Sequence, residues 1–219
     1  VELFEKAIEL EPSYARAHAW RACTLSNLAD WEESPDPKIF ENAIESAKLA
    51  LELDSNEPEV HRIMGALKLW FERDHEMARY HFEKARELCP SDVFIISRYA
   101  IMLIYFAEFD KALEELERAK RLDPFSHDLL FGPEAICHYW LDNPEEALKT
   151  FKKVKVKKNY LFYIALAYKK SGDSDKASEN LKEAYALTGM NNDSFIGSQP
   201  FKDQEFTSKL KSELGNITG

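Results

Sequence analysis

The stretch Phe82-Glu-Lys-Ala85-Arg-Glu-Leu-Cys-Pro90 decides the fold, because close copies of it recur along the chain. Phe4-Glu-Lys-Ala7-Ile-Glu-Leu-Glu-Pro12 is nearly the same, and Leu116-Glu-Arg-Ala119-Lys-Arg-Leu-Asp-Pro124 follows 34 positions after the first. In Ala47-Lys-Leu-Ala50-Leu-Glu-Leu-Asp-Ser55 a serine replaces the proline. A pattern that repeats in this way predicts an array of equivalent structural units. An alanine also stands four positions before three of the copies, at Ala43, Ala78 and Ala112.

The spacing inside each copy has a physical reason. A small alanine lets two helices approach closely, a large apolar residue four positions later fills the space between neighbours, and proline ends the helix. Upstream of the copies, Tyr99-Ala100 with Leu103 and Ile164-Ala165 with Tyr168 repeat a pattern of large, small and large side chains. Together the two patterns resemble the second and first helices of a tetratricopeptide (TPR) repeat.

The resemblance implies an all-α TPR solenoid, a right-handed superhelix of antiparallel helix pairs in which the first helices line the concave inner face. We expect the array to fill residues 1–189. Its parts are an orphan second helix at 1–14 and repeats at about 15–57, 58–92, 93–126, 127–157 and 158–189.

The first repeat carries an insertion, Asp30-Trp31-Glu-Glu-Ser-Pro35-Asp-Pro37, whose polar residues and prolines are typical of a loop. We expect the aromatic ring of Trp31 to fold back and cover the neighbouring helices. The alternative is that Trp31 contacts a partner.

The tail, residues 190–219, breaks the repeat pattern. Residues 190–200 are loop-like in composition, and a helix is expected at about 202–214, with Gly215 as its C-cap. The end of a solenoid exposes an apolar face unless something caps it, so we expect this helix to cover the last repeat. Its apolar stripe consists of Phe206, Leu210 and Leu214.

The composition agrees with long helices joined by short loops. The chain has 219 residues with only 7 Gly and 9 Pro, which is few for the frequent turns of a β sandwich or barrel. No apolar run of about 18 residues is present, so no membrane span is expected. Three scattered cysteines favour a reducing compartment, and we expect the cytoplasm. The sequence starts at Val1 as if inside a helix, which indicates a piece of a longer protein.

The charge of the chain is strongly acidic but uneven. With 29 Lys and Arg against 39 Asp and Glu the formal net charge is −10, so neither nucleic acid nor an anionic membrane is an expected partner. Six lysines fall within ten residues, and removing their six charges from −10 leaves about −16 for the rest. They form either a solvated helix face or a docking patch for an acidic partner. These lysines are Lys149, Lys152, Lys153, Lys155, Lys157 and Lys158.

The sequence contains no enzyme signature. A GxxxxGK[ST] phosphate loop, a GxSxG elbow, an HExxH motif and a GxGxxG motif are all missing. His75 and His81 are six positions apart and so do not share a helix face, while the adjacent Cys137 and His138 point in different directions. We therefore expect no enzyme activity, no metal and no cofactor.

TPR proteins bind partners in their concave groove, and the resemblance implies which positions of the first helices line it. The positions are rich in aromatic and apolar residues, which favours binding of a protein or peptide, or self-association into a homo-oligomer. Alternatively the tail fills the groove and these residues are core. A chaperone-type carboxylate clamp is not expected, because Ala19 and Cys23 stand where Lys and Asn are needed. The proposed groove positions are Arg16, Asn27, Arg62, Trp70, Ser97, Ile101, Tyr105, Tyr139, Trp140 and Phe162.

A finer resemblance rests on residues 3–17, Trp31 in its long turn, Leu122-Asp-Pro124-Phe125 and Pro200-Phe201-Lys-Asp203. These stretches resemble the C-terminal TPR region of bacterial class III adenylate cyclases and of related winged-helix transcriptional regulators. Leu210-Lys-Ser-Glu-Leu-Gly-Asn departs from the Gly-Leu-Arg-Lys-Ala-Gly-like motif of that family. The catalytic or DNA-binding residues of such proteins lie upstream of this region, so none is assigned here.

This resemblance implies a regulatory module of a larger bacterial signalling protein, which binds a protein or peptide or an upstream effector domain of the same chain. A freestanding adaptor or assembly scaffold is the alternative. An enzyme with a site between repeats is the least favoured hypothesis, because the sequence has no catalytic motif.

Overall fold

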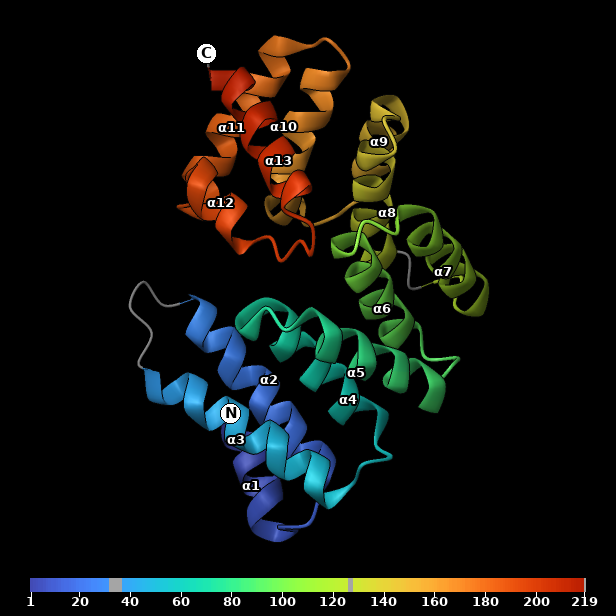
Figure 1. Ribbon diagram of the computed structural model, residues 1–219, viewed down its shortest axis with the longest axis vertical. Helices are drawn as coiled ribbons and strands as arrows, with labels where there is room; N and C mark the ends of the chain where they lie inside the picture. Colours follow the sequence, from blue (N-terminus) through green and yellow to red (C-terminus); the bar gives the residue numbers. More distant parts are fainter. Residues whose placement is uncertain (32–36, 126–127, 219) are drawn as a thin grey trace. The chain divides into compact units, whose positions relative to one another are not determined.

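A computed structural model describes every residue except 32–36, 126–127 and 219, and all regular elements in the described residues are helical (Figure 1). The chain forms two compact units, Val1–Ile95 and Ile96–Gly219. The insertion expected around Trp31 lies largely outside the described residues: Trp31 ends a helix, and nothing further is described until the next helix begins at Pro37.

The first unit is built from antiparallel helix pairs. α2 packs along α3, α4 packs along α5, and the two first helices α2 and α4 also touch. Helix α6 begins at the end of this unit and continues into the next. The elements are α1 (Glu2–Leu10), α2 (Ala15–Trp31), α3 (Pro37–Leu53), α4 (Pro58–Leu67), the π-helical turn η1 (Lys68–Glu72), α5 (His75–Leu88) and α6 (Val93–Tyr105).

The second unit continues the same construction and ends in two helices of the tail. α8 packs on α9, α10 packs on α11, and α13 contacts both α10 and α11 (Figure 1). The elements are α7 (Phe109–Leu122), α8 (Asp128–Trp140), α9 (Pro144–Phe151), the 3₁₀ turn η2 (Lys157–Tyr160), α10 (Leu161–Lys170), α11 (Ser174–Thr188), α12 (Asn192–Ser198) and α13 (Gln204–Thr218). The division into five repeats and an orphan helix stays a prediction.

The alanines of the repeated sequence pattern lie at the buried faces of the second helices. Ala43, Ala78 and Ala112 are fully buried, as are the later alanines of the same helices, Ala50, Ala85 and Ala119. A methyl side chain keeps two helix axes close together, so the large residue beside it fills the remaining space. Phe82 of α5 and Leu116 of α7 are such residues, and both are at most 1% exposed.

The turns between paired helices share one backbone feature, a residue with a positive φ angle. Two positions before the second helix of a pair, the backbone is left-handed at Arg73, Ala107, Asp142 and Gly172, with φ of 55°, 60°, 61° and 87°. A residue with an acceptor side chain follows each of them. Asp74 and Asp173 use that side chain to accept a backbone N–H of the next helix, from Met77 and Lys176 respectively. Each turn therefore reverses the chain within two or three residues, and at Asp74 and Asp173 it also caps the next helix.

The tail is more helical than the sequence predicts. Residues 190–200 were expected to be a loop, but α12 occupies most of this stretch and buries Phe195 and Ile196. A capping box starts it: the Asn191 side chain accepts the Ser194 N–H, and the Ser194 hydroxyl accepts the Asn191 N–H. Helix α13 runs to Thr218, so the expectation that Gly215 ends it is wrong.

None of the helices in the described part of the chain is long and apolar enough to cross a membrane.

The two glycines Gly172 and Gly215 give a test of these turns. Gly172→Ala should lower the free energy of unfolding by about 1–2 kcal/mol, because only glycine adopts φ of 87° without strain. Gly215→Ala should raise it by about 0.5–1 kcal/mol, because Gly215 lies inside α13 with open space at its Cβ position. Urea unfolding of both variants measures the signs. A destabilising Gly215→Ala would instead support a helix end at this position.

Candidate functional site

Four of the predicted groove residues come together in the second unit. Tyr105 ends α6, Tyr139 and Trp140 end α8, and Phe162 lies in the first turn of α10. Tyr139, Trp140 and Phe162 are 0%, 6% and 3% exposed. Their burial shows that another part of the unit covers these aromatic rings.

The tail supplies that cover through aromatic stacking. Phe195 of α12 stacks on Phe162 with ring centroids 4.1 Å apart and planes inclined by 5°. Phe201, just before α13, meets the rings of Tyr105 at 5.2 Å and Trp140 at 5.4 Å in edge-on geometry. Pairs of this kind add about 0.5–1.5 kcal/mol each beyond the area that they bury.

Hydrogen bonds fix the segment between α12 and α13 on the same surface. The Gln199 side-chain oxygen accepts hydrogen bonds from the hydroxyls of Tyr105 (3.2 Å) and Tyr163 (3.3 Å). Burial raises the pKa of Tyr163, so its hydroxyl keeps the proton that it donates. The Lys202 backbone N–H donates to the Tyr105 carbonyl oxygen at 2.9 Å. A segment with little regular structure is thus held as a bound peptide would be, by main-chain and side-chain contacts.

Helix α13 adds a polar contact beside this segment. The Tyr139 hydroxyl donates to the Glu213 carboxylate. Burial, and next the negative charge of Glu213, raise the pKa of Tyr139, so the hydroxyl stays protonated. The Lys170 ammonium lies 4.5 Å from the Tyr139 ring centroid and 3.8 Å from a Glu213 oxygen. This cluster ties α8, α10 and α13 together.

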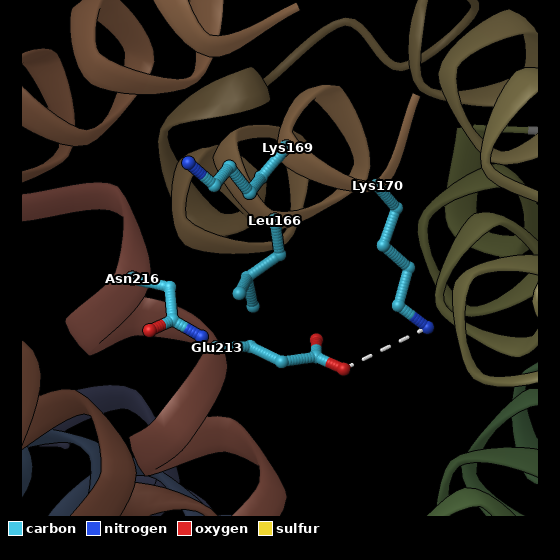
Figure 2. A pocket seen from close by; sticks show the side chains of 5 residues that line it. All are labelled: Leu166, Lys169, Lys170, Glu213 and Asn216. Carbon is cyan, nitrogen blue, oxygen red and sulfur yellow. Dashed lines mark ion pairs between the residues drawn. The ribbon is translucent and has the colours of Figure 1, made fainter. Parts of the chain in front are cut away.

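A pocket of about 200 Å³ opens beside that cluster, between α10 and α13 (Figure 2). Lys170 faces Glu213 across it, while Lys169 and Asn216 lie nearer the other end (Figure 2). Lys170 is engaged further by the Tyr139 carbonyl oxygen (3.3 Å) and the Asp142 carboxylate (3.2 Å). The pocket lining is Leu166, Lys169, Lys170, Glu213 and Asn216.

In the first unit, the predicted groove residue Arg62 is enclosed. Its guanidinium carbon lies 5.2 Å from the Trp20 ring centroid and 4.9 Å from the Phe94 ring centroid, and Glu59 pairs with it at 2.8 Å. Arg62 is 3% exposed. It therefore joins α2, α4 and the start of α6 and does not offer its charge to a partner.

The other groove positions of the first unit are more accessible. The Arg16 side chain is 49% exposed and makes a two-point pair with Glu57, at 3.0 Å for each bond. Asn27 is exposed, and Trp70 is half-buried in the π-helical turn. On α6, in the second unit, Ser97 is completely buried and Ile101 is half-buried. Arg16, Asn27 and Trp70 are thus the predicted positions of this unit at which a partner could bind.

All six predicted patch lysines are exposed. Lys149 lies in α9, Lys157 and Lys158 begin η2, and the others lie in the segment that joins these two elements.

A buried histidine pair lies between α4 and α5, and no pattern in the sequence predicts that these two residues meet. His61 and His81 are 3% and 2% exposed, and their Nδ1 atoms are 3.0 Å apart. His61 Nε2 donates to the Ser55 carbonyl oxygen at 2.9 Å, so His61 Nδ1 is left to accept the Nδ1 proton of His81. In the preceding predicted repeat, His18 likewise contacts the carbonyl oxygen of the residue six positions before it, Pro12. A histidine six positions after the last residue of the repeated sequence pattern is therefore a sequence signal for the bond from His61 to Ser55.

The described residues contain no group of three or more His, Cys, Asp or Glu side chains that could hold a metal ion. Burial raises the pKa of the Cys137 thiol, so it stays protonated and is a poor nucleophile.

Comparison with known proteins agrees with the helix pairs. Models of the tetratricopeptide repeat match residues 3–34 and 159–189. The chain carries TPR repeats. The solved structure of PilF from Pseudomonas aeruginosa shares 15% identity with this chain at a TM-score of 0.62, over 93% of this chain and 91% of PilF.

Two further TPR structures are similar. PilW, a type IV pilus biogenesis factor, has 19% identity and a TM-score of 0.63, over 86% of this chain and 84% of PilW. YrrB, a TPR protein with an unusual peptide-binding site, has 22% identity and a TM-score of 0.51, over 85% of this chain and 92% of YrrB. At these identities the likeness establishes the fold, an all-α TPR solenoid. No curated protein matches the sequence.

Phe201 tests the contact between tail and inner face. Phe201→Ala should lower the free energy of unfolding by about 3–5 kcal/mol, because the ring is 4% exposed and touches Tyr105 and Trp140. Phe125→Ala is the matched control, since Phe125 is 96% exposed and its loss should change stability by less than about 0.5 kcal/mol. Urea unfolding measures both. Equal, small effects would mean that the tail does not pack on this surface.

His81 should make the first unit sensitive to acid. Burial, and next the charges of His61 and Lys68, lower the pKa of His81 to about 4, with Asp74 opposing them. The unfolded chain binds the proton near pH 6.5, so stability is complete above that pH. It should fall by roughly 1 kcal/mol per pH unit as pH drops from about 6.5 towards 4.

The measurement is the urea midpoint of the first unit between pH 7 and pH 4.5. Carboxylates also titrate at the acid end, so His81→Gln is the reference. If the wild type and this variant lose stability equally over the range, the histidine pair is not the cause.

Proposed function

We propose that the chain is a non-catalytic interaction module that binds a protein or peptide through the inner faces of its first helices. The single observation that carries this proposal is the way the second unit holds residues 195–202. Stacked aromatic rings, two tyrosine hydroxyls and a backbone hydrogen bond seat this segment on α6, α8 and α10. The inner face of this fold therefore has the chemistry to hold a peptide. Similarity to YrrB, described as having a peptide-binding site, supports the same use of the fold.

The partner would bind in the first unit, at the predicted groove positions that are exposed or half-buried there. Arg16 offers a cation, Asn27 an amide and Trp70 an aromatic edge, a mixture suited to a peptide with both polar and apolar side chains. In the second unit the tail itself packs on four of the predicted groove residues, which are Tyr105, Tyr139, Trp140 and Phe162.

The finer proposal is that the module is the regulatory part of a larger bacterial signalling protein, and that its partner is an effector domain or another protein. The resemblance to the TPR region of class III adenylate cyclases supports it. A freestanding adaptor or assembly scaffold is the second candidate, and the similarity to the pilus biogenesis factor PilW favours it at the level of the fold. The full coding sequence discriminates between them, because only the first requires an effector domain in the same protein.

Site-specific photo-crosslinking tests the binding surface. A photoreactive amino acid replaces Asn27 on the inner face or, as the matched control, Glu52, which is exposed on the second helix α3. In the source cell, the Asn27 position should give a defined adduct that the Glu52 position does not. The captured protein is then purified and titrated against wild type and Asn27→Ala with Arg16→Ala, for which we expect a Kd about tenfold weaker.

Two results would overturn the proposal. One is an equal adduct pattern at both positions. The other is an unchanged Kd for the double variant when its circular dichroism shows the helices intact.

A further inference from the structure

The basic cluster, defined as Lys149 to Lys158, is held firmly on the second unit. Phe151 and Val154 within it are 2% and 5% exposed, so they anchor the segment to the core. The Tyr160 ring, which follows directly, lies so close to Gly132 of α8 that a Cβ there would be 2.1 Å from it. The positive charges therefore occupy defined places on a packed segment of the fold.

Carboxylates compensate the lysines of this cluster only in part. Lys149 pairs with Glu146 at 3.1 Å, and Lys153 lies 5.2 Å from the Phe131 ring centroid. Among the residues that the structure describes, no carboxylate forms an ion pair with Lys152, Lys157 or Lys158. Helices elsewhere pair lysines with carboxylates three or four positions away, as in Lys68–Glu72, Lys111–Glu108 and Lys176–Asp173.

Uncompensated like charges at this spacing repel one another within a Debye length of about 8 Å, which disfavours the cluster unless an opposite charge approaches. An apolar side chain stands among them: Val156 is 64% exposed. A charged rim around an exposed apolar residue is the arrangement of a small interaction surface.

We propose that the basic cluster docks an acidic segment of a partner protein, one that carries carboxylates on both sides of an apolar residue. The carboxylates meet Lys152, Lys157 and Lys158, and the apolar residue covers Val156. This surface uses other residues than the proposed peptide-binding positions of the first unit, so it is a second interaction site.

The negative charge of the remaining chain favours a short acidic segment over a larger polyanion as the partner of the cluster. Outside the cluster the chain carries about −16, the −10 of the whole less six lysine charges. A nucleic acid or an anionic bilayer extends beyond the cluster and meets that negative surface, whereas a short acidic segment touches the lysines alone.

Two charge-matched triple variants test the proposal with the full chain. One is Lys152→Glu, Lys157→Glu and Lys158→Glu; the other is Lys48→Glu, Lys182→Glu and Lys211→Glu, at exposed positions outside the cluster. Both change the net charge equally. The probe is a fluorescein-labelled peptide of about a dozen residues with Glu on both sides of a central Leu, and fluorescence anisotropy measures Kd at about 50 and 300 mM NaCl.

The cluster triple variant should weaken Kd at least about tenfold and the control triple less than about twofold, with affinity falling as salt rises. Val156→Ser should weaken Kd a further few-fold at both salt concentrations. Circular dichroism and the urea midpoint confirm that each variant is folded. Equal weakening by the two triples would show a response to net charge alone and overturn the proposal. Tighter binding of the wild type to phosphatidylserine vesicles than to the peptide would also overturn it.

Discussion

The close approach of paired helices at buried alanines is the constraint on which the rest of the structure depends. Ala47, Ala85, Ala119, Ala147 and Ala184 are all at most 1% exposed on second helices. A larger side chain at any of these positions would push the helices apart and misplace the large residues that fill the space beside them. Because paired helices are held in this way, the left-handed turns need only reverse the chain, and two or three residues are enough to do it.

A repeated helix pair leaves an apolar face at the end of the array that must be covered. The tail covers this face and further residues as well. Leu210 and Leu214 of α13 are fully buried, as a capping helix requires. Phe195, Gln199 and Phe201, however, extend the contact to the aromatic first-helix positions of the same unit. Capping the end and filling the inner face are therefore one set of contacts, so a change in the tail would alter both.

The repeat, the helix pairs and the existence of a final helix could be predicted from the sequence, because they depend on local spacing of alanine, large apolar residues and proline. The helix α12 was not predicted, since its burial depends on tertiary contact, such as the stacking of Phe195 on Phe162 of α10. The groove residues were predicted from their positions within each repeat, which do not show what packs against them. Whether Tyr105 or Arg62 faces solvent depends on what covers it: the tail in one unit, and the rings of Trp20 and Phe94 in the other.

The histidine pair and the lysine cluster show two opposite ways in which this fold treats positive charge. Burial, and next the charges of His61 and Lys68, oppose protonation of His81, and a single proton satisfies both Nδ1 atoms of the pair. At the cluster, several exposed lysines lie close together, and Lys152, Lys157 and Lys158 form no ion pair with a carboxylate of the described residues. Water screens their repulsion but does not cancel it, so an approaching carboxylate gains the attraction of several lysines and relieves their mutual repulsion at the same time. That gain is largest where several exposed lysines lie close together along the chain, as they do at the cluster.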